Sequence, residues 1–585
     1  MEWRCSMIIL FRFLIRYLQP YRMPVVIVFV LVFLNSLANL YLPSLMADIV
    51  DTGIVKGDTA YILRVGGLML LVTIGGTICA IIASFFSARV AIGFGRLIRG
   101  KLFKHVENFS LHEFDSVGTA SLITRTTNDT TQVQQVVIII LQMMISAPLM
   151  FIGGIILAIS QDATLAWVLV GIIPILLIAI FVIMGKAIPL FQAMQAKIDR
   201  VNLVLDEGLT GVRVIRAFDR IDHEEKRFAD ANLDLTDTAI KVNQIVAAMM
   251  PIMMLVLNLS TIAIFWFGSI RINNGDMQIG NLMAFLQYAM QILFAVLMLS
   301  MMFIMLPRAA ASATRIDQVL GMEPEINDPA TAKQADAQRG YVEFQNVTFS
   351  YPGAEEPALY NISFRASPGE VTAIIGGTGA GKSTLVSLLP RFYDVDEGRV
   401  LVDGVDVREM TQEHLRVKIG FMPQKAVLFS GTVAENIRYG NEEASEEEVK
   451  HAADIAQATE FIDEMPDGFD SVIAQGGTNV SGGQKQRLSI ARAIVRKPEI
   501  YVFDDTFSAL DYATDARLRA ALKGETLDAT VLIVAQRVGT VMDADRIIVL
   551  DEGRIAGTGT HRELMETSEI YHEIVSSQLS LEEIA

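Results

Sequence analysis

Apolar residues are concentrated in six long runs in the first part of the chain, up to about Arg315. The runs are Met23–Leu45, Ile62–Phe86, Val136–Ile159, Leu165–Met184, Ile245–Ile270 and Leu282–Met305. A helix needs about 20 apolar residues to cross the hydrocarbon core of a bilayer. We therefore predict six transmembrane helices. The shorter run Ile8–Leu18 is interrupted by Arg12 and Arg16, which is typical of a helix lying at the membrane surface.

Basic residues are concentrated in the two long segments between the second and third runs and between the fourth and fifth runs. The loops Asp48–Asp58 and Arg271–Gln278 each contain a single basic residue. By the positive-inside rule, both long segments and both termini face the cytoplasm. Within the second long segment, apolar residues recur at helical spacing from Val201 to Val212. We therefore expect the transmembrane helices to continue into the cytoplasm.

From Tyr341 onward, short apolar runs alternate with helical patterns, which indicates a soluble α/β domain. Strands are expected at Val342–Phe349, Val371–Ile375, Thr530–Val534 and Arg546–Leu550. The preceding stretch is rich in Pro, Ala, Asp and Gln, as expected for a linker. The predicted domains are a membrane domain over residues 1–322, a linker over 323–340 and the α/β domain over 341–585, whose candidate ligand site is described below.

Composition supports a membrane protein and excludes one class of partner. The chain has 585 residues, of which 52% are hydrophobic, and its mean hydropathy is +0.41. This is too apolar for an ordinary soluble domain, so membrane lipids are expected neighbours. The net charge of -17 argues against a nucleic-acid partner.

Polar residues inside the spans bear on the cargo. No charged residue lies deep within a span, which favours hydrophobic or amphiphilic small molecules as cargo over strongly charged ones. Asn35 and Asn39 lie one helical turn apart in the first span, as do Gln287 and Gln291 in the sixth. These pairs either line a cavity or hold helices together.

A phosphate-binding loop follows the expected strand Val371–Ile375. Its residues, with Thr384 directly after them, are Gly376, Gly377, Thr378, Gly379, Ala380, Gly381, Lys382, Ser383 and Thr384. The glycines let backbone N–H groups surround phosphates, Lys382 neutralises them, and Ser383 can bind Mg²⁺. The sequence therefore predicts ATP and Mg²⁺ as ligands.

A second candidate metal ligand ends another buried strand. The apolar run Tyr501–Phe503 leads directly into Asp504 and Asp505. An unpaired carboxylate at such a place would be costly, and a metal partner for Asp504 would offset that cost.

The segment Val480–Gln484, with the sequence VSGGQ, together with the phosphate-binding loop and the six spans, resembles a half-transporter of the ABC exporter superfamily. The resemblance extends to Ser121–Asp129 and Gly211–Phe218, which are similar to the two coupling segments of such exporters. It implies that Ser481, Gly482, Gly483 and Gln484 cap the nucleotide bound to a second half-transporter. It also implies that Tyr351 stacks on adenine and that Gln424 reaches Mg²⁺ or the attacking water.

Two residues depart from the family pattern. Asp505 stands where a hydrolytic member carries glutamate, and Gln536 stands where the family has a switch histidine. The aspartate is one methylene shorter, and glutamine cannot carry a proton or a positive charge. His561 follows a later strand, so we expect a surface residue there and not a substitute for the histidine.

These departures resemble the degenerate-site subunit of bacterial heterodimeric multidrug ABC exporters. The resemblance implies a site that binds ATP and hydrolyses it poorly, in a protein of the bacterial cytoplasmic membrane with its ATPase domain in the cytoplasm. It also implies a partner with an intact glutamate and histidine. The alternatives are a homodimeric drug or lipid flippase with two weak sites, or an ATP-regulated channel or sensor on the same scaffold.

Overall fold

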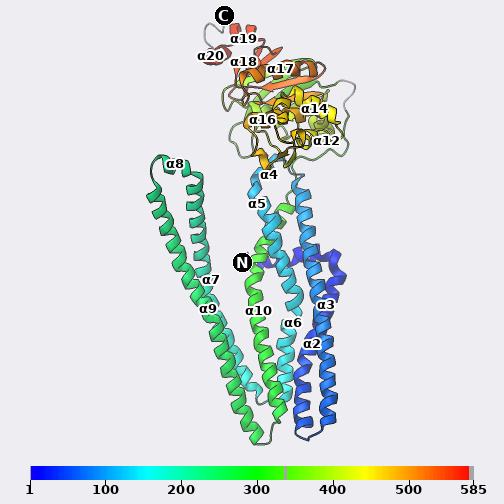
Figure 1. Cartoon of the computed structure of the whole chain (residues 1–585), viewed down its shortest axis with the longest axis vertical. Coiled ribbons are helices and arrows are strands. Elements are labelled where there is room, and N and C mark those ends of the chain that lie inside the picture. Colours follow the sequence, from blue (N-terminus) through cyan, green and yellow to red (C-terminus); the bar gives the residue numbers. More distant parts are fainter. Residues whose placement is uncertain (1, 335–338, 579–585) are drawn as a thin grey trace. The chain divides into compact units, whose positions relative to one another are not determined.

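The computed structural model describes residues 2–334 and 339–578 (Figure 1). The chain divides into two compact units. The first unit takes its residues from Met1–Glu107 and Ala120–Met322, and the second takes its residues from Asn108–Thr119 and Glu323–Ala585. The first is built from α-helices and the second from sheets and helices, which confirms the predicted fold class.

Among the described residues, six helices of the first unit are long and apolar enough to cross a membrane. They are α2 (Arg22–Asp48), α3 (Thr59–Val106), α6 (Thr130–Gln161), α7 (Ala166–Thr210), α9 (Ile221–Asn273) and α10 (Ile279–Leu320). Each contains one predicted span, except that the span Leu165–Met184 begins one residue before α7. The 53 residues of α9 are more than twice the ~20 that a bilayer requires, so the predicted extension of the helices is confirmed for this segment.

The predicted surface helix forms the end of a separate helix, α1 (Glu2–Leu18). A 3₁₀ turn over Gln19–Tyr21, containing Pro20, separates α1 from α2. The side chains of Leu10, Phe13 and Tyr17 are buried, at spacings of three and four residues. Because residues at this spacing share one face of a helix, α1 packs through a single apolar face.

Helices α7 and α9 form an antiparallel hairpin whose turn contains α8 (Val212–Ala217). Figure 1 shows this hairpin leaning away from α2, α3, α6 and α10 toward the α8 end. Apolar side chains near the turn are exposed, and Leu209 and Phe218 are each 75% exposed. Exposed apolar residues grouped beyond the spans are typical of a protein contact surface.

Polar residues in the spans hold α2 against α10. The Gln291 side-chain amide donates to the Asn39 carbonyl oxygen at 3.1 Å. The Tyr288 hydroxyl donates to the Leu40 carbonyl oxygen at 2.9 Å and also pairs with Ser44 Oγ at 2.7 Å. For Gln291, this contact agrees with the helix-packing interpretation, because interhelical hydrogen bonds stabilise membrane bundles.

The described residues of the second unit form three sheets. Its strands are β1 (Val342–Phe349), β2 (Leu359–Ala366), β3 (Val371–Gly376), β4 (Glu397–Val402), β5 (Val405–Asp406), β6 (Ile419–Met422), β7 (Gly431–Thr432), β8 (Val472–Ile473), β9 (Ile500–Asp504), β10 (Thr530–Val534), β11 (Arg546–Asp551) and β12 (Arg554–Gly559). The predicted strands at β1 and β10 are confirmed to the residue, and those at β3 and β11 are each one residue longer than expected.

The largest sheet has the order β12-β11-β3-β10-β9-β6, and its strands pair in parallel except for β11 with β12. The second sheet has the order β2-β1-β4-β5 and is antiparallel. The carboxyl ends of neighbouring parallel strands meet at one edge, where α/β sheets bind ligands. In this domain β3, β9 and β10 bring the phosphate-binding loop, Asp505 and Gln536 to that edge.

Helices cover the sheets of this unit. They are α11 (Lys382–Leu388), α12 (Gln412–Val417), α13 (Val433–Arg438), α14 (Glu446–Ile455), α15 (Thr459–Asp463), α16 (Gly482–Ile494), α17 (Tyr512–Glu525), α18 (Val538–Val541), α19 (His561–Thr567) and α20 (Glu569–Gln578). The short helices α4 (Leu111–Val117) and α5 (Thr119–Thr124) precede them in the chain. Phe503 and Ile490 are both buried in one apolar cluster, so β9 and α16 are parts of one core.

Candidate functional site

The phosphate-binding loop lies between β3 and α11. Gly379 and Gly381 adopt φ angles of 85° and 92°, which glycine reaches without steric cost. Lys382 is the first residue of α11, and its ammonium donates to the carbonyl oxygens of Gly376 at 2.8 Å and Gly377 at 2.7 Å. Burial lowers the pKa of Lys382, while the nearby carboxylates of Asp505 and Asp504 act in the opposite direction. The loop therefore holds a cation where it can meet phosphate.

We expect Gly376→Ala to destabilise the ATPase domain. A Cβ at Gly376 would lie 2.1 Å from the Leu550 carbonyl oxygen, a backbone atom that cannot move aside cheaply. Overpacking of this kind typically costs about 1–3 kcal/mol. The measurement is thermal unfolding of the nucleotide-free chain. Gly377→Ala is the matched control, because a Cβ there meets nothing within 4 Å; equal unfolding midpoints for the two variants would contradict the prediction.

Ser383 and Asp504 form the pair expected of a metal site. Ser383 Oγ donates to Asp504 Oδ1 at 2.8 Å. Asp504 is only 5% exposed; burial raises its pKa, and the Ser383 hydrogen bond acts in the opposite direction. No cluster of three His, Cys, Asp or Glu residues suited to a metal occurs in the described parts of the chain. A hydroxyl and a carboxylate nevertheless fit Mg²⁺, which takes one or two protein ligands together with substrate phosphates and water.

Asp505 is fixed by two glutamine side chains. Its Oδ2 accepts a hydrogen bond from Gln536 Nε2 at 2.8 Å and another from Gln424 Nε2 at 3.2 Å. Its backbone has a φ of 48°, and its N–H donates to the Val534 carbonyl oxygen at 3.0 Å. Asp505 itself is 8% exposed. Three residues predicted separately from the sequence therefore meet at one carboxylate oxygen.

The arrangement limits what Asp505 can do. Two amide protons already occupy Asp505 Oδ2, so these hydrogen bonds compete with the proton of an attacking water for that oxygen. Neither Gln424 nor Gln536 can take that proton onward, because an amide does not titrate in this range. Gln424 is directed at Asp505 in this structure, whereas the sequence pointed to a role on Mg²⁺ or water.

The VSGGQ segment, Val480–Gln484, is called the signature from here on, and it leads into α16. Ser481 is the N-cap residue, and its Oγ accepts from the Gln484 N–H at 3.3 Å while Gln484 Oε1 accepts from the Ser481 N–H at 2.8 Å. This reciprocal capping box fixes the first turn of the helix. A Cβ at Gly483 would lie 3.3 Å from the Ala509 carbonyl oxygen, while one at Gly482 would meet nothing within 4 Å. Within its own chain, therefore, Gly482 has space for a side chain.

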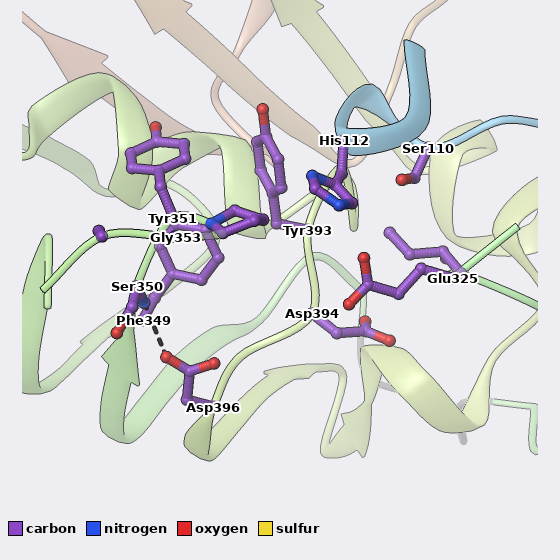
Figure 2. A pocket seen from close by; sticks show the side chains of 13 residues that line it. Ser110, His112, Glu325, Phe349, Ser350, Tyr351, Gly353, Tyr393, Asp394 and Asp396 are labelled. Atoms are coloured by element: carbon purple, nitrogen blue, oxygen red, sulfur yellow. Dashed lines mark hydrogen bonds between the residues drawn. The ribbon is translucent and has the colours of Figure 1, made fainter. Parts of the chain in front are cut away.

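Tyr351 borders a cavity of about 430 Å³ (Figure 2). Its ring is 41% exposed, and its hydroxyl pairs with Thr384 Oγ1 of α11 at 2.9 Å. The ring packs edge-on against Phe349 and Tyr393. An exposed aromatic face tied to the phosphate-binding helix is well placed for the predicted contact with adenine.

The cavity also contains residues that sequence reasoning missed. Figure 2 shows His112 of α4 beside Tyr393, with Glu325, Asp394 and Asp396 lower in the view. Helix α4, which carries His112, could have been predicted from the capping box at its start. In this capping box the Ser110 N–H donates to Glu113 Oε2 at 2.7 Å. A serine followed three residues later by glutamate marks a helix start in sequence.

A stretch that precedes the predicted coupling segment groups with the second unit. The sequence resemblance indicates Ser121–Asp129, but the residues that group with the ATPase unit are Asn108–Thr119. Glu113 explains part of this grouping, since its Oε1 accepts from the Glu325 N–H at 3.1 Å. Ser121–Asp129 instead belongs to the first unit, where Arg315 pairs with Asp129.

Comparisons with known proteins agree with these features. Family models for the ABC transporter transmembrane region and for the ABC transporter match residues 25–296 and 359–508. An uncharacterised ABC transporter ATP-binding protein of Mycobacterium tuberculosis is 46% identical, over 96% of this chain and 97% of that protein. A putative multidrug export ATP-binding/permease protein of Bacillus subtilis is 31% identical, over 96% of this chain and 98% of that protein.

A solved structure of a bacterial Atm1-family ABC exporter with ATP bound is also similar. The match has a TM-score of 0.79 and 27% sequence identity, and it covers 96% of this chain and 98% of the other. Members of this family bind ATP in the ABC domain and couple its hydrolysis to transport. The chain belongs to the ABC transporter family, as an exporter half-transporter with a transmembrane region and an ATPase domain on one polypeptide.

Proposed function

We propose that this chain is one half of a heterodimeric exporter whose own ATP site binds nucleotide and hydrolyses it poorly. The observation that carries the proposal is the Asp505 carboxylate, held by Gln536 and Gln424. A shorter acid that is tied by two amides, with no imidazole beside it, is a poor base for the attacking water. A displacement of about 1 Å can cost on the order of 100-fold in rate.

In this proposal the binding functions of the site remain intact. Lys382 and the loop Gly376–Gly381 hold the phosphates, Tyr351 meets the adenine, and Ser383 with Asp504 would hold Mg²⁺. When bound, the metal would supply positive charge to the phosphate oxygens. The residues that bind ATP are all present, whereas the catalytic glutamate and histidine are replaced. This combination favours ATP that stays bound in this site as a ligand.

The same proposal gives the intact signature its role. Ser481, Gly482, Gly483 and Gln484 complete the site of a second half-transporter that has glutamate and histidine in place. The side chains of Leu209, Val214 and Phe218 around α8 are apolar and exposed. They offer a contact surface of the kind that such an assembly needs.

The cargo is an amphiphilic or hydrophobic compound, as in multidrug export. The spans lack deep charged residues, and the intramembrane Gln291 is engaged in helix packing. The protein lies in the bacterial cytoplasmic membrane, as its resemblance to bacterial exporters implies. The positive-inside rule favours cytoplasmic termini and a cytoplasmic ATPase domain.

We expect the double substitution Asp505→Glu with Gln536→His to increase ATP turnover by about 10- to 100-fold, because it restores the length of the base and an imidazole. The measurement is phosphate release by the purified chain in nanodiscs, where two copies supply both a phosphate-binding loop and a signature. The Lys382→Ala variant gives the background. Wild-type turnover of about ten per second, which is typical of a good enzyme, would contradict the proposal and favour a homodimer with competent sites.

A further inference from the structure

The last described helix, α20, is anchored in the core of the ATPase domain. Tyr571 and Val575 are fully buried, and the Tyr571 hydroxyl pairs with His561 Nδ1 at 2.7 Å. His561 is half-buried, so it is less exposed than a free surface side chain. Its ring lies at the start of α19 and fixes α20 through Tyr571.

The same face of α20 carries Gln578 to the loop that follows β10. Residues 571, 575 and 578 are spaced by four and three positions, so they share one helical face. Gln578 Oε1 accepts from the Val538 N–H at 2.9 Å, and Gln578 Nε2 donates to the Gln536 carbonyl oxygen at 2.9 Å. One side-chain amide therefore satisfies a backbone donor and a backbone acceptor on either side of Arg537.

The contact of Gln578 with Gln536 is linked to the ATP site through the Gln536 side chain. The residue whose carbonyl is held by Gln578 is the same Gln536 whose side chain donates to Asp505 at 2.8 Å. Hydrogen bonds therefore connect Asp505 to the backbone of residues 536–538 and then to α20. We propose that Gln578 is a positioning residue: it fixes the loop of residues 535–537 and thereby holds the Gln536 amide on Asp505.

The position of Gln578 favours this role over a purely structural one. Its side chain is exposed, whereas the apolar anchors of α20 are buried without it. Removal of Gln578 should therefore leave the helix in place and release only the loop. The loop geometry is independent of how well the site hydrolyses ATP. Only the expected effect on nucleotide retention rests on the proposed function.

The first test is amide hydrogen exchange of the full chain in nanodiscs, followed at Val538. Gln578→Ala removes the hydrogen bond from the Val538 N–H to Gln578 Oε1. We expect the amide exchange rate at Val538 to rise roughly fivefold, as the loss of one such hydrogen bond predicts. Gln578→Glu keeps the acceptor for the Val538 N–H and loses the donor to Gln536, so Val538 should remain protected. Ser577→Ala is the matched control, because Ser577 Oγ donates to the Ile574 carbonyl within α20. Unchanged exchange at Val538 in Gln578→Ala would overturn the inference.

The second readout separates positioning from structure. We expect both Gln578→Ala and Gln578→Glu to release a fluorescent ATP analogue from this chain faster than wild type, with no change in the unfolding midpoint. Raised exchange with unaltered release would overturn the positioning role. If the site proves to be a competent hydrolase, Gln578→Ala would lower its turnover while the exchange result stands, so failure of the proposed function is distinguishable from failure of this inference.

Discussion

Gly482→Asp is expected to slow ATP turnover of the assembled exporter by about 100- to 1000-fold, the loss typical when one stabilising group of a transition state is removed. A side chain at Gly482 meets nothing within 4 Å in its own chain, so the substitution should not disturb the fold. Its carboxylate would lie at the N-terminus of the 13-residue helix α16. There it would repel the phosphates of a nucleotide presented by the partner.

The measurement is ATPase activity and dye efflux of the co-expressed pair. Asp505→Asn is the comparison variant, because it changes a site that already hydrolyses ATP slowly in this account. It should therefore lower the total ATPase rate of the pair much less than Gly482→Asp does. Ser481→Ala should fall between the two, since it removes a donor without adding charge. Loss of turnover in Asp505→Asn with near-normal turnover in Gly482→Asp would mean that the competent and degenerate sites are assigned the wrong way round.

Lys382→Ala is expected to weaken ATP binding to this chain by about 10- to 100-fold, because charged hydrogen bonds contribute about 1.5–3 kcal/mol each. The Lys382 ammonium is the cation of the loop, held at 2.8 Å and 2.7 Å from two of its carbonyl oxygens. Chemistry at the partner's site should continue, while occlusion of nucleotide at this site and transport both slow. Equilibrium binding of labelled ATP, with Lys382→Arg as the charge-conserving control, provides the measurement. Unaltered affinity in Lys382→Ala would contradict the role of this loop.

The sequence predicts the strands around the site because their signals are local. Val342–Phe349 mixes apolar and polar residues, as in a strand with one buried face, and Thr530–Val534 is mostly apolar; the structure has strands at the same residues. The order of the sheet brings Gly376, Asp504 and Val534 together at one edge. Recognising the phosphate-binding loop therefore placed most of the site.

The remaining contacts depend on residues far apart in the chain. Gln578 and Gln536 are 42 positions apart, and a lone glutamine near the end of a chain carries no signal of such a contact. The grouping of Asn108–Thr119 with the second unit was missed for a related reason, and the resemblance of Ser121–Asp129 to a coupling segment stays a prediction. The motif was recognised by resemblance, while the grouping of Asn108–Thr119 with the ATPase unit depends on a tertiary contact of Glu113 with Glu325.

The most direct test is to identify the nucleotide on this chain after several transport cycles. The co-expressed pair is loaded with a photoreactive ATP labelled on the α-phosphate, allowed to turn over, crosslinked and separated into its two chains. The account predicts intact triphosphate on this chain, held at the loop of Lys382, and diphosphate on the partner. Diphosphate in equal proportion on both chains, or equal exchange rates at the two sites, would contradict it.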